Sequence, residues 1–262
     1  MNMGNSLLYA TLGTLFTFLM TSAGAAVVFF FKGKPSENMT RSFMGFAAGV
    51  MIAASVWSLL IPAIDAQEAA GEIGWIPAAG GFLIGVAFLL LLDNIIPHLH
   101  RSSNEVEGPK TSLKRTTLLV LAVTLHNIPE GMAVGLAFAM GAQDGNFAPA
   151  IALAIGMGIQ NFPEGAAMSL PLRHEGNSAF KSFFIGSMTG IVEPIFGISV
   201  VLLANVIEPF MPWLLSFAAG AMIYVTVEEL IPEATSGKHS HAGTLGVMLG
   251  FVIMMVLDVA LG

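Results

Sequence analysis

Two short segments of this 262-residue chain carry side chains that bind metal ions. Residues 126–131 read His-Asn-Ile-Pro-Glu-Gly, and residues 160–165 read Gln-Asn-Phe-Pro-Glu-Gly. In each segment the first residue and the glutamate stand at positions i and i+4, so a helix places both on one face. The asparagine at i+1 points about 100° away and can serve a neighbouring site. Glu193-Pro194 places a further glutamate beside a proline.

The prolines of these segments predict irregular backbone. A proline lacks an N–H group, so the carbonyl four residues earlier loses its usual helical partner. The carbonyls concerned belong to Leu125, Ile159 and Gly190. Irregular backbone at membrane depth normally lines a cavity or an ion site.

Charge also points to a bound cation. Glu130, Glu164 and Glu193 lie inside long apolar segments whose interiors contain no Lys or Arg. Placing one ionised group near the middle of a bilayer costs about 2.5–3.5 kcal/mol on insertion scales, and clustered carboxylates repel one another. A divalent cation removes both penalties. Any one of these residues alone could be a structural or proton-carrying group, but the doubled pattern favours a metal.

The types of ligand narrow the choice of metal. An imidazole with carboxylate and amide oxygens suits zinc, iron(II), manganese, cobalt or cadmium. The chain contains no cysteine, which excludes thiolate metal sites and disulfide bonds. Calcium is disfavoured because imidazole is a poor ligand for it.

The elements that hold these side chains are predicted to be those of an all-α integral membrane protein. The chain is 55% apolar and 10% charged, whereas soluble domains carry roughly 25% charged residues. Apolar runs of about 20 residues, enough to cross a bilayer, recur over the whole length and predict a single transmembrane domain over residues 1–262. The first run lacks a basic n-region and is too long for a cleavable signal sequence. The eight predicted spans cover about 7–31, 42–63, 76–97, 116–141, 147–171, 178–204, 212–233 and 243–261.

The basic residues predict the orientation. With eight spans, all of them lie on one side, namely Lys32, Lys34, Arg41, Arg101, Lys110, Lys114, Arg115, Arg173, Lys181 and Lys238. The positive-inside rule makes that side cytoplasmic and places both termini outside. The polar loop at about 98–115 is then cytoplasmic. The opposite loops carry only acidic charges, which either concentrate cations or merely reflect the orientation.

Glycine pairs predict close helix packing. GxxxG pairs let two helices approach closely within a membrane bundle. They occur at Gly45/Gly49, Gly81/Gly85, Gly131/Gly135, Gly186/Gly190 and Gly246/Gly250.

Two further groups of polar residues lie on the predicted cytoplasmic side. Asp93, Glu228 and Glu229 stand near the inner ends of spans 3 and 7, where they either form an exit site for metal or cap helices. Two His-x-His pairs either capture metal transiently or are ordinary loop residues. These pairs are His98 with His100 and His239 with His241.

The motifs resemble those of the ZIP (Zrt/Irt-like) metal-ion transporters, and those of their bacterial GufA-like branch most. The resemblance covers essentially the whole chain. Besides the segments at 126–131 and 160–165 and Glu193-Pro194, it rests on residues 48–51 (Ala-Gly-Val-Met) and 228–233 (Glu-Glu-Leu-Ile-Pro-Glu).

The resemblance implies a metal site between spans 4 and 5. Its primary ligands would be His126, Glu130, Gln160 and Glu164, with Met51 approaching from span 2. A second site, bridged by the two glutamates, would adjoin it and use Asn127, Asn161 and Glu193. Some relatives have Asp where Asn161 stands, and many have His where Glu228 stands. Asp65 and Asp258 would fit the family's entrance.

The resemblance also implies a 3+2+3 arrangement, in which spans 1–3 and 6–8 are inverted repeats around spans 4 and 5. Leu60-Ile61-Pro62 ends span 2 outside and Leu230-Ile231-Pro232 ends span 7 inside, as an inverted repeat predicts. Similar proteins form homodimers and are thought to move spans 1, 4, 5 and 6 as a unit against spans 2, 3, 7 and 8.

The sequence therefore predicts a transporter that takes zinc, or cadmium, iron, manganese or cobalt, through the inner membrane into the cytoplasm by alternating access. The metal is cargo rather than a cofactor, and the expected partners are membrane lipid and a second copy of the chain, with no nucleic acid. The alternative is a proton- or sodium-coupled transporter of another solute, in which the glutamates bind the coupling ion. A metal enzyme is disfavoured because the chain has no HExxH motif.

Overall fold

The computed structural model describes residues 3–31, 36–97, 109, 115–237 and 240–261. All regular elements within these ranges are helices and none is a strand, which confirms the all-α prediction. The elements are α1 (Met3–Ala25), η1 (Ala26–Phe29), α2 (Glu37–Ala54), η2 (Ser55–Leu60), α3 (Ile61–Ala69), α4 (Trp75–Ile95), α5 (Arg115–Asp144), α6 (Ala148–His174), α7 (Ala179–Met188), η3 (Thr189–Ile191), α8 (Val192–Leu202), α9 (Ala204–Ile207), η4 (Glu208–Phe210), α10 (Met211–Val225), η5 (Thr226–Leu230), α11 (Ile231–Thr235) and α12 (Ala242–Leu261).

Seven helical runs in the described part of the chain are long and apolar enough to cross a bilayer. They are Ser6–Phe29, Glu37–Ala69, Trp75–Ile95, Thr117–Asp144, Ala179–Leu202, Ala204–Thr235 and Ala242–Leu261. Helix α6 corresponds to the remaining predicted span. It has 27 residues and, at 1.5 Å per residue, is about 40 Å long. It is less apolar than the seven runs because it contains Gln160, Asn161 and Glu164. Seven or eight apolar helices are the composition of an integral membrane protein.

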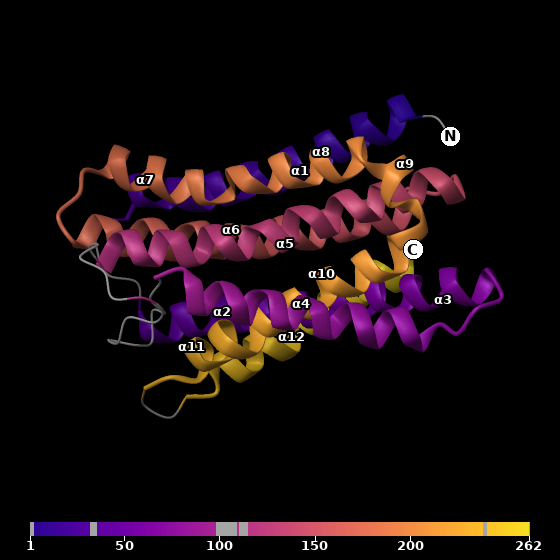
Figure 1. Ribbon diagram of the computed structural model, residues 1–262. Coiled ribbons are helices and arrows are strands. Elements are labelled where there is room, and N and C mark those ends of the chain that lie inside the picture. Colours follow the sequence, from indigo (N-terminus) through magenta and orange to yellow (C-terminus); the bar gives the residue numbers. More distant parts are fainter. Residues whose placement is uncertain (1–2, 32–35, 98–108, 110–114, 238–239, 262) are drawn as a thin grey trace.

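The helices form two layers (Figure 1). The first layer contains α1, α5, α6 and the run α7–η3–α8, and the second contains the runs α2–α3 and α10–α11 together with α4 and α12. The most extensive contacts lie within layers, between α1 and α6, α5 and α8, α2 and α12, and α4 and α10. The layers meet where α6 contacts α2 and α12, and where α5 contacts α10. The two helices that carry the metal-binding motifs are therefore the ones that touch the opposite layer.

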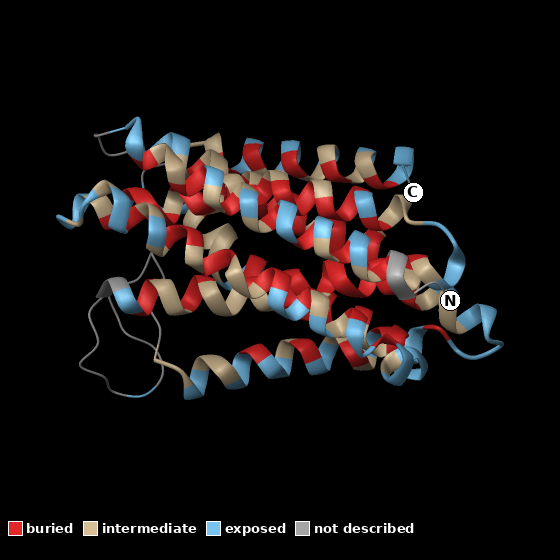
Figure 2. Ribbon diagram, turned by 90° about the horizontal axis from the view of Figure 1, so that it is seen from above, coloured by how far each residue is buried: buried red, intermediate tan, exposed pale blue. Residues whose placement is uncertain are grey.

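Burial follows this arrangement. Buried residues lie along the inner faces of the helices, and exposed ones face outward (Figure 2). Many exposed side chains are large and apolar, such as Leu83, Leu245 and Val259 at 65%, 66% and 68% exposure. A soluble protein rarely leaves so continuous an apolar surface in water, so lipid is the natural surrounding of this one.

Glycines bring α4 and α10 into backbone contact. A Cβ atom added at Gly85 would lie 2.1 Å from the carbonyl oxygen of Phe217, and one at Gly220 would lie 2.1 Å from that of Phe82. Real Cβ atoms do not approach oxygen so closely, so only glycine allows this packing.

Helices α12 and α2 repeat the same contacts. A Cβ atom at Gly250 would lie 2.1 Å from the carbonyl oxygen of Phe46, and one at Gly49 would lie 2.0 Å from that of Val247. In both pairs of helices, each partner supplies a glycine to the other's backbone. The GxxxG prediction of close packing is confirmed at these helices.

The runs α2–α3 and α10–α11 also share a backbone irregularity. Each changes from α-helix to a π-helical segment, η2 or η5, directly before an Ile-Pro pair. Residues 47–52 (Ala-Ala-Gly-Val-Met-Ile) and 218–223 (Ala-Ala-Gly-Ala-Met-Ile) precede these segments and differ at one position. π-Helical turns inside α-helices frequently occur at functional sites.

We expect Gly250→Leu to destabilise the protein, because its side chain would meet the backbone of α2. The expected cost is about 1–3 kcal/mol or more, measured as a lower midpoint of thermal unfolding in detergent. The matched control is Leu249→Val, at an exposed neighbouring position, which should change stability by about 0.5 kcal/mol or less. Equal midpoints for the two variants would contradict the close approach of α2 and α12.

Candidate metal centre

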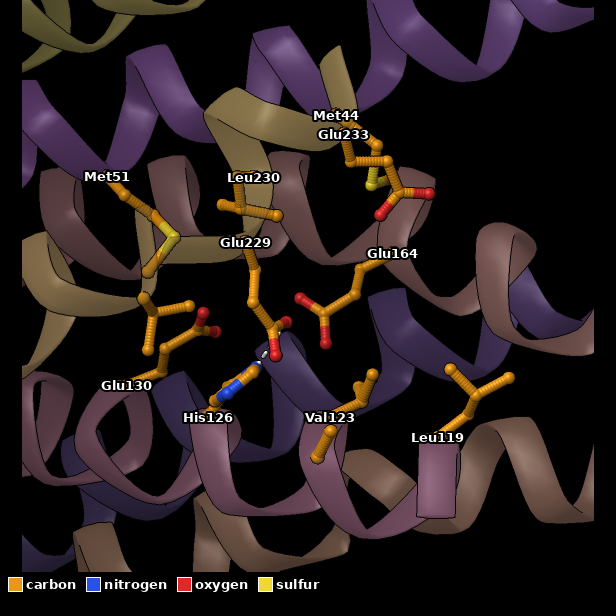
Figure 3. Close-up of a pocket in the computed structure, with 12 residues that line it drawn as sticks. Met44, Met51, Leu119, Val123, His126, Glu130, Glu164, Glu229, Leu230 and Glu233 are labelled. Atoms are coloured by element: carbon orange, nitrogen blue, oxygen red, sulfur yellow. Dashed lines mark ion pairs between the residues drawn. The ribbon is translucent and has the colours of Figure 1, made fainter. Parts of the chain in front are cut away.

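A small cavity between the layers contains metal-binding side chains from several helices (Figure 3). Its volume is about 30 Å³, close to the share of one water molecule in the liquid. His126 and Glu130 reach it from α5, Glu164 from α6 and Met51 from α2. The structure thus brings four of the predicted ligands to one place.

His126 forms an ion pair across the layers. Its Nδ1 atom lies 3.1 Å from Oε2 of Glu229, which belongs to η5, and both side chains are nearly buried, at 12% and 13% exposure. A histidine that ligates a metal usually donates its other ring N–H to a carboxylate or carbonyl, which fixes its orientation. With Nδ1 directed at Glu229, a metal in the cavity would bind through Nε2.

The glycine of each motif is a point of contact between helices. A Cβ atom at Gly131 would lie 2.4 Å from the carbonyl oxygen of Glu193, and one at Gly165 would lie 2.0 Å from that of Thr21. Glycine therefore lets α5 touch the start of α8 and lets α6 touch α1. Each motif ends in glycine because its ligand-bearing turn packs directly on a neighbouring backbone.

Two residues predicted for a second site, Asn161 and Glu193, form a hydrogen-bonded chain with Gln160, which was predicted as a primary ligand. Gln160 Nε2 donates to Asn161 Oδ1 at 2.8 Å, and Asn161 Nδ2 donates to Glu193 Oε2 at 2.9 Å. Thr21 Oγ1 lies 3.4 Å from Glu193 Oε1. Asn127 is also buried, and neither of its amide atoms has a hydrogen-bond partner among the described residues.

The sequence predicted irregular backbone at Pro129, Pro163 and Pro194, and the structure shows it at only one of the three. Helices α5 and α6 stay α-helical through Pro129 and Pro163. Only the run that contains Pro194 changes, to the 3-10 helix η3 at Thr189–Ile191. Irregular backbone thus lies beside Glu193 and, in the π-helical segment η5, at Glu229, while His126, Glu130 and Glu164 stand on regular helix.

The imidazole and carboxylate groups of the cavity are distributed over three helical segments, α5, α6 and η5–α11. The described residues contain no group of three or more His, Asp or Glu side chains in a metal-binding arrangement. In Figure 3, Glu130, Glu164 and Glu229 approach His126 from different helices. A metal would have to draw these carboxylates together, and methionine or amide groups would complete the set.

The two predicted entrance residues have different surroundings. Asp258 of α12 is buried at 8% exposure and accepts a hydrogen bond of 2.6 Å from Ser58 Oγ. Asp65 of α3 is exposed. Only Asp258 is therefore held in a defined position by a neighbouring helix.

The predicted exit residues are similarly divided. Glu229 lines the cavity, whereas its neighbour Glu228 is exposed. Asp93 is half-buried and accepts a hydrogen bond of 2.5 Å from the hydroxyl group of Tyr224. His241 is exposed. The other three histidines of the His-x-His pairs, His98, His100 and His239, lie outside the described residues.

Sequence reasoning missed two cavity side chains that carry possible ligand atoms, Glu233 of α11 and Met44 of α2. They extend the polar and sulfur-containing lining beyond Glu164, as Figure 3 shows. A signal for Glu233 was present, because Glu229 and Glu233 stand at positions i and i+4 and so share one helix face. Met44 has no comparable signal, since buried methionines are common.

Comparisons with known proteins agree with the motifs. The sequence model of the family described as ZIP Zinc transporter matches residues 101–258. The chain belongs to this family. Zinc transporter ZIP11 of Homo sapiens is 36% identical to it over 98% of this chain and 98% of its own length.

Bacterial members of the ZIP family are similar over most of the chain. Zinc transporter GufA of Myxococcus xanthus is 38% identical over 79% of this chain and 81% of its own length. Zinc transporter ZIPB of Bordetella bronchiseptica is 36% identical over 97% of this chain and 82% of its own. The predicted GufA-like ZIP resemblance is confirmed, and so is the prediction that the protein is a transporter rather than an enzyme.

We expect Glu229→Ala to weaken metal binding about tenfold, because His126 loses the carboxylate that orients its ring. A titration of the purified protein with Co²⁺, followed by absorbance, measures the affinity. Glu228→Ala is the matched control, since Glu228 is the exposed neighbour, and it should leave the affinity unchanged. Tighter binding in Glu229→Ala would mean that Glu229 competes with the metal for His126.

Proposed function

We propose that this protein carries divalent metal ions, zinc above all, across the membrane into the cytoplasm by alternating access. The observation that carries the proposal is the cavity between the layers, where His126, Glu130 and Glu164 of one layer meet Met51 and Glu229 of the other. Imidazole and carboxylate ligands suit zinc, and the similar ZIP11, GufA and ZIPB proteins are named zinc transporters. Cadmium, iron(II), manganese and cobalt share these ligand preferences and are further candidate cargo.

The division of the ligands between two layers supports alternating access. A shift of one layer along the other would change which groups surround the ion and to which side the cavity opens. The cavity extends to Met44 and Leu119, near the starts of α2 and α5. Farther along the interface the layers are closely packed: Met254 of α12 is fully buried, and a Cβ atom added at Gly156 of α6 would lie 2.1 Å from its sulfur atom. We therefore assign this structure to a state that faces the end where α2 and α5 begin.

The proposal includes one transmembrane domain over residues 1–262 with eight spans in a 3+2+3 arrangement. The equivalent glycine contacts of α4 with α10 and of α12 with α2 support inverted repeats, as do the matching π-helical segments. Described basic residues gather at the end where α2 and α7 begin and α6 ends, namely Arg41, Arg173 and Lys181. By the positive-inside rule that end is cytoplasmic, so the termini lie outside and the cavity faces inward. An inner-membrane location and a homodimer complete the proposal.

A path for the ion follows from these assignments. At the outer end, Asp258 with Ser58, and the exposed Asp65, would receive the metal. At the inner end, Glu229 and Glu233 line the cavity and would pass the ion on from the central ligands. Glu228 and Asp93 would act, if at all, after the ion leaves the cavity, since neither lines it.

His126→Ala and Glu130→Ala should each abolish zinc uptake while the protein level is kept, because each removes a ligand of the cavity. Radioactive zinc uptake into proteoliposomes measures this effect. Glu175→Gln, an exposed carboxylate at the end of α6, is the matched control and should transport normally. Undiminished zinc uptake in both cavity variants would overturn the proposal, and saturable metal-free transport of an organic solute would favour the coupled-transporter alternative.

The entrance assignment predicts that Asp258→Asn raises the zinc KM of uptake severalfold with little change in the maximal rate, because a local carboxylate no longer attracts the ion. Zinc concentration series in proteoliposomes give both values. Asp144→Asn is the matched control, because it removes an exposed acidic charge at the same end of the molecule. Equal effects of the two variants would indicate a general surface field instead of an entrance at Asp258.

A further inference from the structure

Glu193 is a buried carboxylate whose charge must be compensated. Its exposure is 1%, and it stands in the first turn of α8. The sequence contains no Lys or Arg from residue 116 to 172 or from 182 to 237. The groups that the structure places on its two oxygens are neutral donors, Asn161 Nδ2 at 2.9 Å and Thr21 Oγ1 at 3.4 Å. The compensation at Glu193 is therefore made by hydrogen bonds.

Two acceptors determine the direction of the amide chain beside Glu193. Asn161 Nδ2 donates to Glu193 Oε2 at 2.9 Å and, at 3.4 Å, to the carbonyl oxygen of Thr17, so its own carbonyl oxygen cannot take that place. Its Oδ1 atom then faces the opposite way and accepts from Gln160 Nε2 at 2.8 Å. Gln160 is thereby oriented as well, and its Oε1 atom is buried without a partner among the described residues. The donors thus run in one direction, from Gln160 to Asn161 to Glu193.

We infer that the Asn161 amide takes the place of a second cation, so that this centre binds one metal ion and Glu193 positions Asn161 and Gln160 instead of ligating metal. The inference rests on the proposed function, since it concerns the same centre. Glu130 and Glu164 line the cavity and can neutralise one divalent ion between them. Glu193 lies outside the cavity lining, with its charge met by neutral donors.

A second ion at Glu193 would have to undo this network. It would displace the N–H group of Asn161 from Glu193 Oε2, and a turned Asn161 would then present an N–H group, not an oxygen, to Gln160 Nε2. Asn127, which follows His126 on α5, is buried and has an amide oxygen that could bind a cation, but it adds no negative charge. Hydrogen bonding and charge therefore both act against a second divalent ion.

Aspartate at position 161 would reverse both effects. Its side chain has no N–H group to give to Glu193, and it adds a negative charge. Its other oxygen would still accept from Gln160, so the remainder of the chain would persist. Two facing carboxylates without a donor between them must share a proton or a cation, and a divalent cation neutralises both charges. A single substitution should therefore create the second metal site.

The test is the number of metal ions bound by the purified full-length protein. Equilibrium dialysis with Zn²⁺ followed by elemental analysis should give about one ion per chain for the wild type and about two for Asn161→Asp. The double variant Asn161→Asp/Glu193→Gln restores the original number of carboxylates and should return to about one. This double variant is the matched control, because both proteins carry the same change at position 161.

The positioning role of Glu193 has a separate readout. Glu193→Gln keeps an acceptor for Asn161 and should retain the Co²⁺ absorption spectrum and a single bound ion. Glu193→Ala removes the shorter of the two hydrogen bonds of Asn161 Nδ2 and leaves only the 3.4 Å contact with the Thr17 carbonyl, so Gln160 is held less firmly. We expect an altered Co²⁺ spectrum and an affinity about tenfold lower, still with one ion bound. A structural defect alone would lower the stability of the protein without the rescue by glutamine.

The outcomes separate this inference from the proposed function. Two ions in the wild type, falling to one in Glu193→Gln, would show that Glu193 is a ligand and would overturn the inference alone. A single ion in a folded Asn161→Asp variant would also overturn it. No bound metal in the wild type would overturn the proposed function itself. Should Asn161→Asp fail to fold, the wild-type and Glu193→Gln counts still decide the question.

Discussion

Negative charge buried without lysine or arginine beside it is the constraint on which the rest of this structure depends. Glu130 and Glu193 are each 1% exposed, in helices whose other buried residues are mostly apolar. An ionised group in such an environment is stable only with a partner. The structure supplies two kinds of partner. Neutral donors meet Glu193, and in the proposed function the carboxylates of the cavity share a transported cation.

The arrangement of the helices in two layers is compatible with a transport cycle in which the layers move relative to each other. Backbone contacts at glycines hold each layer together. In the second layer they join α2 with α12 and α4 with α10, and in the first layer they join α5 with α8 and α6 with α1. The contacts between layers are less extensive, and the cavity lies among them. In the proposed function the ligands come from both layers. The binding free energy of the ion would then depend on how the two layers are positioned relative to each other. Binding that depends on position is what allows a ligand to shift a conformational equilibrium.

Each residue of the motifs has a separate task in this arrangement. In the segment at 160–165, Asn161 connects α6 to α8, Glu164 reaches the cavity, and Gly165 lets α6 lie on α1. In the segment at 126–131, His126 reaches across to the second layer, and Gly131 lets α5 lie on α8. The ligands are therefore positioned by the same turns that join the helices of the first layer, which keeps the first layer's part of the site rigid.

The sequence by itself determined the helical class, the membrane environment and the family, and it predicted the types of metal ligand. These depend on local composition and on periodicity, such as the i and i+4 spacing of His126 and Glu130. Only the tertiary structure decided that Glu229 faces the cavity while Glu228 does not, that His126 pairs with Glu229, and that Asn161 turns its N–H group toward Glu193. It also decided that the helix interruption falls at η3 and not at Pro129 or Pro163. These features depend on side-chain rotation and on contacts between helices far apart in the chain, and no local pattern records either.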